Sequence, residues 1–162
     1  MKNKRMAELG LMIALAFVLG YLESLLPLQL GIPGAKLGLA NVVTLIAIIR
    51  LGPKEAMTVA VVRAVLSGFT FGSLYSMIYS LAGGILSTLI MWGINKSKRF
   101  SVIGVSVAGG VAHNIGQLFV AMFVLKSIDL KFYSGFLTIC GIATGVFIGV
   151  ICITVLKNIR TN

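Results

Sequence analysis

The sequence contains few acidic residues and a single histidine. One aspartate and three glutamates occur among 162 residues, so the chain cannot build the paired aspartate-rich motifs that hold magnesium in diphosphate chemistry. A lone histidine without an acidic neighbour in its segment is not expected to bind a metal, and no Walker A pattern is present. We therefore predict a protein that is not an enzyme and has no cofactor, so that any ATP-driven work comes from a partner.

Cysteine is also scarce, and the two cysteines cannot pair with each other. Cys140 and Cys152 fall in the last apolar run, and their twelve-residue separation corresponds to about 18 Å along a helix. A disulfide requires Cα atoms within about 7 Å of each other. We interpret both as small residues that pack in apolar surroundings.

The chain lacks any polar, proline-rich or charged stretch long enough to act as a linker, so residues 1–162 are predicted to form one domain. Apolar residues are abundant instead: 58% of the residues are hydrophobic, 11% are charged, and the mean hydropathy is +1.04. A water-soluble fold of this length could not bury so much apolar surface. The composition predicts an integral membrane protein.

Apolar runs alternate with short polar or glycine-containing turns and predict an all-α bundle of six transmembrane helices. The second and third helices are expected to be short. The expected helices are Ala7–Leu26, Leu39–Leu51, Glu55–Gly68, Leu74–Ile94, Val102–Leu125 and Ser134–Leu156. The prolines and glycines of residues 27–36 forbid a regular helix, and we expect this segment to fold over the outer mouth of the bundle.

The formal net charge of +10 does not indicate a nucleic-acid partner, because lysine and arginine form short clusters between apolar runs. These clusters follow the positive-inside bias. With the N-terminus inside, ten basic residues lie in inner segments, one lies within a helix, and Lys36, Lys126 and Lys131 lie in outer loops. Both termini are therefore predicted to be cytoplasmic, in a multi-pass protein of a prokaryotic plasma membrane.

Small residues recur at four-residue intervals, a spacing that lets helices approach closely in lipid. We expect most of these stripes to pack helices within the bundle and at least one to dock a separate subunit. The stripes are Gly10 and Ala14; Ala56, Ala60, Ala64 and Gly68; Gly104, Ala108, Ala112 and Gly116; and Gly141, Gly145 and Gly149.

Arg63 is the strongest single functional signal, because it lies about eight residues into the third expected helix. A charge near the bilayer centre costs about 2.5–3.5 kcal/mol on insertion scales and persists mainly with a polar partner or a function. The alternative to a ligand is an internal ion pair with Glu23 or Glu55, or a water-filled crevice.

The fifth expected helix carries three polar residues near and beyond the bilayer midplane. His113 and Gln117 share one face at a spacing of four, and Asn114 is adjacent. These side chains should face protein or water. They either bind a ligand or form hydrogen bonds between helices.

Further polar residues approach the same depth from outside. Lys36, Asn41 and Thr44 follow a Pro-Gly turn, where a helix N-terminus favours an anion; the alternative is that Asn41 and Thr44 only satisfy backbone groups or neighbouring helices. Tyr75 and Tyr79 begin the fourth expected helix and either contact a ligand or anchor the helix at the interface. With the arginine and the three polar residues above, they predict an outward-opening pocket with cationic and aromatic walls.

The chain contains the run PGAKLGLANVVTL at 33–45, the turn LGPKEA at 51–56, Arg63 and the His113–Asn114 pair. Together these features resemble the Gx transporter family, also called heptaprenyl diphosphate synthase component I. That family is similar in architecture to the S components of energy-coupling factor (ECF) transporters. The resemblance therefore implies six helices, cytoplasmic termini and a binding site near the outer face.

The resemblance also implies partners. In ECF systems a small-residue motif on the first helix docks a transmembrane coupling subunit, and two cytoplasmic ATPases drive movement of the small-molecule substrate across the lipid membrane. The matching positions here are Gly10 and Ala14, or Ala16 and Gly20. The first helix has no alanine pair at a spacing of four, so this match is loose.

Two functions fit these observations. In the first, the protein captures a small anionic or aromatic molecule, for example a flavin-type vitamin or nucleotide, and delivers it inward with an ATP-driven partner. In the second, it is a non-catalytic membrane component that assists the synthesis or handling of heptaprenyl or another polyprenyl diphosphate. A third, structural role would leave the polar residues only to hold helices together.

Overall fold

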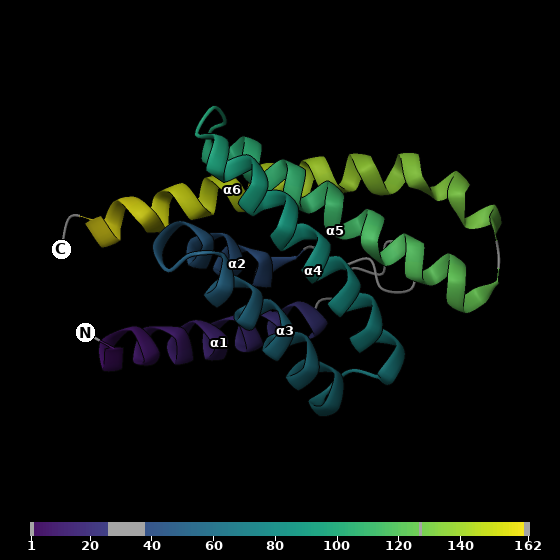
Figure 1. The fold of residues 1–162 in the computed structure, drawn as a ribbon. Coiled ribbons are helices and arrows are strands. Elements are labelled where there is room, and N and C mark those ends of the chain that lie inside the picture. Colours follow the sequence, from purple (N-terminus) through teal and green to yellow (C-terminus); the bar gives the residue numbers. More distant parts are fainter. Residues whose placement is uncertain (1, 26–37, 127, 161–162) are drawn as a thin grey trace.

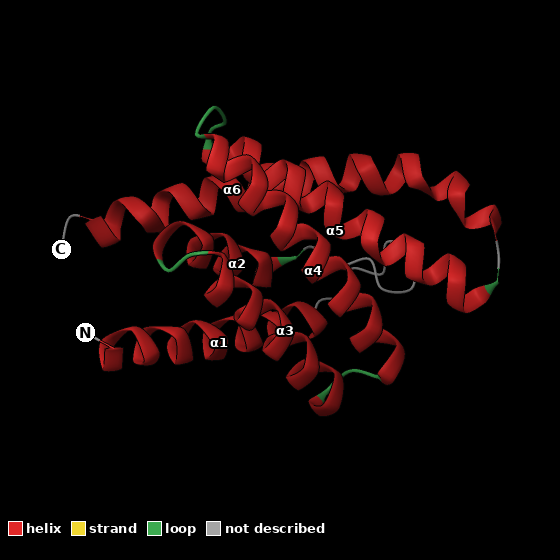
Figure 2. Cartoon of the chain, viewed as in Figure 1, coloured by secondary structure: helices red, strands yellow, loops and turns green. Residues whose placement is uncertain are grey.

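The computed structural model describes residues 2–25, 38–126 and 128–160, and all regular elements in these ranges are helical (Figure 2). Six α-helices were expected, and the described residues form six α-helices and one short 3-10 helix. The elements are α1 (Lys2–Leu25), α2 (Leu39–Arg50), α3 (Pro53–Thr70), α4 (Leu74–Ser97), α5 (Val102–Leu125), η1 (Ile128–Tyr133) and α6 (Ser134–Arg160).

Successive helices run in alternating directions, so that α1 begins and α6 ends at the same end of the bundle, on the left in Figure 1. The α2–α3 and α4–α5 turns lie at this end too. We call it the termini end, and the other the far end, where α3 joins α4. Helix α3 packs against α4, α4 against α5, and α5 against α6, whereas α1 packs against α2 and α3.

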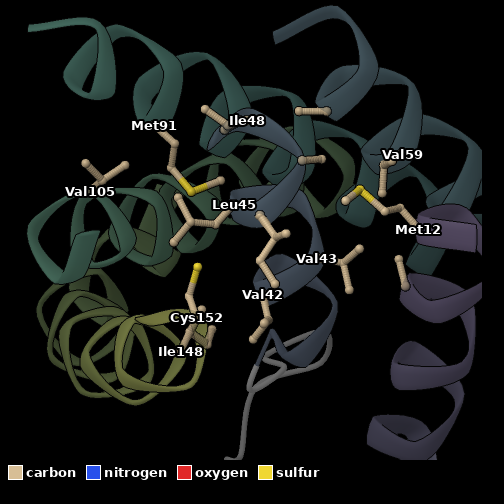
Figure 3. Packing of buried hydrophobic residues seen from close by; sticks show 14 residues of the cluster. Met12, Val42, Val43, Leu45, Ile48, Val59, Met91, Val105, Ile148 and Cys152 are labelled. Carbon is tan, nitrogen blue, oxygen red and sulfur yellow. The ribbon is translucent and has the colours of Figure 1, made fainter. Parts of the chain in front are cut away.

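Helix α2 lies in the centre of the bundle. Every residue from position 40 to position 48 is buried, and Figure 3 shows Val42, Val43 and Leu45 among side chains of the surrounding helices. Its twelve residues extend over about 18 Å, less than the roughly 30 Å hydrocarbon core of a bilayer. Burial by its neighbours, rather than contact with lipid, therefore accounts for its apolar composition.

Four of the described helices, α1, α4, α5 and α6, are long and apolar enough to cross a membrane. Helix α3 has 18 residues but includes three charged ones, Lys54, Glu55 and Arg63. The expectation of a multi-pass membrane protein is thus supported by four helices, whereas six crossings stay a prediction. Residues 27–36, expected to cover the outer mouth, lie outside the described residues.

The helix boundaries differ from the expected ones mainly at the polar ends. Helix α1 begins at Lys2 rather than Ala7, and α6 continues to Arg160 rather than Leu156, because a helix does not stop where it leaves the apolar core. Helix α3 begins at Pro53, since proline has no N–H to lose in the first turn and its φ is already helical.

Glycines bring α5 and α6 into close contact along their length. An alanine Cβ at Gly145 would lie 2.5 Å from Cα of Val107, and one at Gly141 or Gly149 would lie 2.9 or 2.8 Å from the backbone of α5. Real side chains do not tolerate such distances, so only glycine permits this packing. The expectation that this stripe packs helices within the bundle is confirmed.

Two ion pairs join α1 to its neighbours at the termini end. Arg5 lies 2.6 Å from Glu55 of α3, and Glu8 lies 3.0 Å from Arg50 of α2. Arg5 also donates a hydrogen bond of 2.6 Å to the carbonyl oxygen of Leu51. These contacts are partly exposed, so each stabilises the fold by well under a kilocalorie to about 1 kcal/mol.

Candidate functional site

Polar side chains buried inside the bundle come from five helices. Most of them lie within the chain segments that the sequence assigns to the bilayer, where an unsatisfied polar group is costly. The buried polar residues are Glu23, Asn41, Thr44, Arg63, Ser67, Ser80, Ser87, Thr88, Ser106, His113, Asn114 and Gln117. Six of the nine residues predicted to bind substrate, Arg63 among them, are therefore buried in the interior. Tyr75 and Tyr79 are not, and Lys36 lies outside the described residues.

Arg63 lies in the middle of α3 with 5% of its surface exposed. Its Nη2 atom faces α4, where a Cβ added at Gly84 would lie 3.7 Å away. Within the described part of the chain, the Nε and Nη2 atoms are buried and make no hydrogen bond. The guanidinium thus keeps donors that could bind an acceptor on another molecule.

Glu23, near the end of α1, supplies the negative charge that acts on Arg63. Its carboxylate also accepts a hydrogen bond from the backbone N–H of Gly38. Gly38 has a φ of 78°, a left-handed conformation that glycine adopts without strain. Of the two carboxylates considered as partners of Arg63, the structure favours Glu23, because Glu55 pairs with Arg5.

His113 approaches α4 from the opposite neighbour, α5. A Cβ at Gly83 would lie 3.0 Å from Cε1 of the imidazole and 2.8 Å from the His113 carbonyl oxygen. The ring nitrogen Nε2 lies 3.1 Å from Nε2 of Gln117, the spacing-of-four pair expected from the sequence. Arg63 and His113 therefore contact α4 at two successive glycines, Gly84 and Gly83, one from α3 and one from α5.

Asn114 has a different role from its neighbour. Its Nδ2 atom donates a hydrogen bond of 2.8 Å to the carbonyl oxygen of Leu137 in α6. The alternative reading of this segment, in which an amide joins two helices, is confirmed for Asn114.

Two of the residues predicted at the outer start of the second helix are buried in α2. Asn41 places its amide near Gly38, where an added Cβ would lie 3.0 Å from Nδ2, and so lies beside the hydrogen bond of Glu23. Thr44 donates a long hydrogen bond of 3.5 Å to the carbonyl oxygen of Ala40, as expected if it satisfies the backbone. Lys36, the third predicted residue, lies outside the described residues.

The two predicted tyrosines lie near the far end of α4. Tyr75 is 61% exposed and Tyr79 is partly buried, so neither belongs to the buried polar group. Instead, a different set of aromatic side chains gathers between α1 and α3: the ring of Phe71 lies 5.5 Å from that of Phe17 and 5.3 Å from that of Tyr21. The sequence analysis did not select these three residues.

The small residues of α1 divide between two faces. Gly10 and Ala14 are exposed, and a Cβ at Gly10 would meet no atom within 4 Å. Ala16 and Gly20 are buried, and a Cβ at Gly20 would lie 3.6 Å from Oγ of Ser67. Of the two expected docking pairs, only Gly10 and Ala14 lie on a free face of this chain.

Sequence reasoning missed Gly83 and Gly84 as parts of the site. The signal was present, because two adjacent glycines inside an apolar helix indicate close approach by neighbouring groups. Ser67, whose Oγ is buried without a hydrogen bond in the described residues, was missed because a serine in an apolar helix usually bonds its own backbone.

Comparisons with known proteins identify the family and the fold. Residues 12–155 match the heptaprenyl diphosphate synthase component I family, which confirms the resemblance inferred from the sequence. The structure is similar to that of the S component of a bacterial ECF transporter, with a TM-score of 0.78 and 21% sequence identity over 99% of this chain and 98% of the other. A comparison with curated proteins gave no match. The chain therefore has the fold of an ECF S component.

Proposed function

This chain belongs to the heptaprenyl diphosphate synthase component I family, and we propose that it acts as a membrane-embedded substrate-binding subunit. In this proposal it resembles an S component, takes up a small molecule, and depends on an energy-coupling partner for ATP-driven movement. It performs no chemistry on its ligand. The fold that it shares with an S component supports this assignment.

The proposed arrangement in the membrane has six crossings and cytoplasmic termini. Helices α1 and α6 have their termini at the same end of the bundle (Figure 1), as an even number of crossings requires. Ten of the fourteen basic residues belong to the segments at that end, and the positive-inside bias favours the cytoplasm for them. The far end would then face outward, in a prokaryotic plasma membrane.

Arg63 is the observation that carries the proposal. A guanidinium buried in an apolar bundle is costly unless its donors find acceptors, and Nε and Nη2 find none within the described part of the chain. Glu23 compensates part of the charge, but it also bonds Gly38. An acceptor group on a bound small molecule would complete the coordination of Arg63.

The residues around Arg63 favour a ligand with anionic or carbonyl oxygens. Guanidinium groups bind carboxylate and phosphate oxygens through charge-assisted hydrogen bonds. His113 and Gln117 on the other side of α4 can supply a further donor and acceptor, and Asn41 an amide. A flavin-type vitamin or nucleotide has both carbonyl and phosphate acceptors, and we propose this class, with Lys36, Thr44, Asn114, Tyr75 and Tyr79 as further contacts to be tested.

The test measures what the purified protein binds. Mass spectrometry of small molecules released on denaturation identifies any ligand that copurifies. Unfolding temperature is then recorded with riboflavin, flavin mononucleotide and other phosphorylated vitamins, because a ligand that binds only the folded state raises that temperature. The proposal of an anionic vitamin fails if no compound is released and none of these shifts the transition.

Variants separate ligand binding from a structural role of Arg63. The double variant Glu23→Gln with Arg63→Gln removes both charges, so it leaves no isolated buried ion and should fold. We expect it to lose at least about tenfold in affinity, since a hydrogen bond to a charged group contributes about 1.5–3 kcal/mol. Arg99→Gln, at an exposed position of the termini end, is the matched control and should bind normally. A folded double variant with unchanged affinity would assign Arg63 a purely structural role.

The exposed pair Gly10 and Ala14 is the proposed contact with an energy-coupling membrane subunit. A flat face of small residues lets another helix approach closely, and both residues are exposed on α1. Ala14→Trp should prevent copurification of that subunit and its ATPases while leaving ligand binding intact. Normal assembly of this variant would exclude the face as the contact.

A second candidate function follows from the family description itself, which names a component of heptaprenyl diphosphate synthase. In that case the chain would help a soluble synthase to handle a polyprenyl diphosphate. Copurification with such a synthase, together with altered quinone side-chain length when the gene is deleted, would favour this role over uptake. The shortage of acidic residues argues against a catalytic version of it.

A further inference from the structure

Large apolar side chains are exposed on five successive elements at the far end of the bundle, where α5 also joins α6 (Figure 1). We call them the far-end girdle. Its members are Phe69 of α3, Tyr75 of α4, Phe123 of α5, Ile128 and Phe132 of η1, and Phe136 of α6. Because these elements follow one another around the bundle, the girdle indicates a surrounding that they all share rather than a patch for one partner.

The short helix η1 combines apolar and charged side chains. Ile128 and Phe132 are 72% and 77% exposed, an arrangement that water disfavours. Asp129 and Lys131 belong to the same six residues, and the Lys131 ammonium lies 5.3 Å from the centre of the Phe132 ring. The apolar span of α6 begins within η1, at Lys131. Such a segment suits the boundary between hydrocarbon and water, where rings and charged groups are both accommodated.

The spacing along three helices places the girdle at the depth of a membrane interface. Twenty-one residues separate Tyr75 from Lys96 in α4, and the same number separates Phe136 from Lys157 in α6. In α5 this spacing separates Phe123 from the first residue of the helix. It corresponds to about 32 Å of α-helix, close to the roughly 30 Å thickness of the hydrocarbon core. When the basic end of the bundle lies in one interface, the girdle therefore lies in the other.

We infer that the far-end girdle binds the headgroup region of a lipid bilayer, and that η1 lies on the bilayer surface among the headgroups. Aromatic side chains are enriched at membrane interfaces, and a lysine beside them extends its charge toward water. A docked subunit would cover one side of the bundle, whereas a bilayer contacts all its outer helices. This lipid contact goes beyond substrate uptake, because it involves side chains outside the buried polar group and needs no transported ligand.

Tryptophan fluorescence of the full-length chain in vesicles of phosphatidylcholine and phosphatidylglycerol tests this contact. Trp92 is the single tryptophan of the sequence, so Trp92→Phe with Phe132→Trp reports on η1 alone. We expect a spin label near the lipid headgroup to quench this variant about twofold more strongly than a label near the end of the acyl chain. Quenching by aqueous iodide with no effect of either lipid label would place η1 in water. Emission insensitive to iodide and to both labels would mean that protein covers it, and either result would overturn the inference.

A matched position in the same background checks the depth scale. Phe147 lies in the middle of α6 and is also exposed, so Phe147→Trp should be quenched most strongly by the label near the end of the chain. The same order of quenching for Phe147→Trp and Phe132→Trp would contradict the assignment. Tyr75→Trp, in the girdle of α4, repeats the measurement if the Phe132 variant does not fold, and it should show the headgroup pattern. Failure of vitamin binding would not alter these results, since no vitamin is present.

Discussion

Replacing Gly145 by alanine tests how closely α5 and α6 are held together. The added Cβ would lie 2.5 Å from Cα of Val107 and 3.0 Å from the carbonyl oxygen of Ser106. Carbon atoms in comfortable contact are about 3.5–4.0 Å apart. Because the clash is with backbone, no side-chain rotation relieves it, and α6 must move away from α5 by about 1 Å.

The cost follows from that displacement. Moving α6 also loosens the contacts at Gly141 and Gly149, whose positions are almost as close to the backbone of α5. Overpacking costs about 1–3 kcal/mol, whereas alanine in place of glycine gains up to about 1 kcal/mol of helix propensity. We expect Gly145→Ala to lower the free energy of unfolding by about 1–2 kcal/mol.

Unfolding of the purified protein in mixed micelles, titrated with sodium dodecyl sulfate and followed by circular dichroism, measures this difference. Gly93→Ala is the matched control, because a Cβ at that position of α4 would meet no atom within 4 Å. It should be neutral or stabilise the protein by less than about 1 kcal/mol. If both variants unfold at the same detergent fraction, the close approach of the two helices does not stabilise the bundle and the reasoning is wrong.

Three further predictions concern polar contacts. Asn114→Ala removes the hydrogen bond to α6 and should cost about 0.6–1.7 kcal/mol in the same titration; an unchanged midpoint would mean that the bond contributes nothing. A double-mutant cycle on Arg5 and Glu55, which are 57% and 21% exposed as side chains, should give a coupling of about 0.2–1 kcal/mol that decreases with salt, and a larger, salt-independent value would contradict it. Glu23→Gln leaves Arg63 buried without its counter-charge and should therefore lower the unfolding temperature. In protein that circular dichroism shows to be folded, it should raise the affinity for flavin mononucleotide severalfold relative to that for riboflavin by calorimetry; an unchanged affinity ratio would show that Arg63 does not contact the phosphate.

The sequence predicted the existence and type of the helices because apolar runs of this length have few alternatives in lipid. Helix α5 has the expected bounds of Val102 and Leu125. The boundaries of α1, α3 and α6 were displaced because the polar residues at their ends continue the helix into water, which hydropathy does not register. The short 3-10 helix η1 gave no periodic signal and was not expected.

The site was only partly predictable. Arg63 and His113 were selected because a polar group within an apolar helix is costly unless it has a partner or a function. The sequence could not tell that both residues contact α4. These contacts depend on which helices are neighbours. They are made at Gly83 and Gly84, which sequence analysis did not select because glycine has no side chain that could bind a ligand. Tyr75 shares a helix with these glycines, yet helix rotation leaves it 61% exposed.

The sequence by itself determined that the chain is an apolar helical protein with a basic end, since composition, run length and charge bias are properties of each segment alone. Only the tertiary structure decided which carboxylate acts on Arg63, which small-residue face of α1 is free, and which apolar side chains are exposed together at the far end. These features depend on the rotation and neighbours of each helix, and such relations between distant segments arise only when the helices pack.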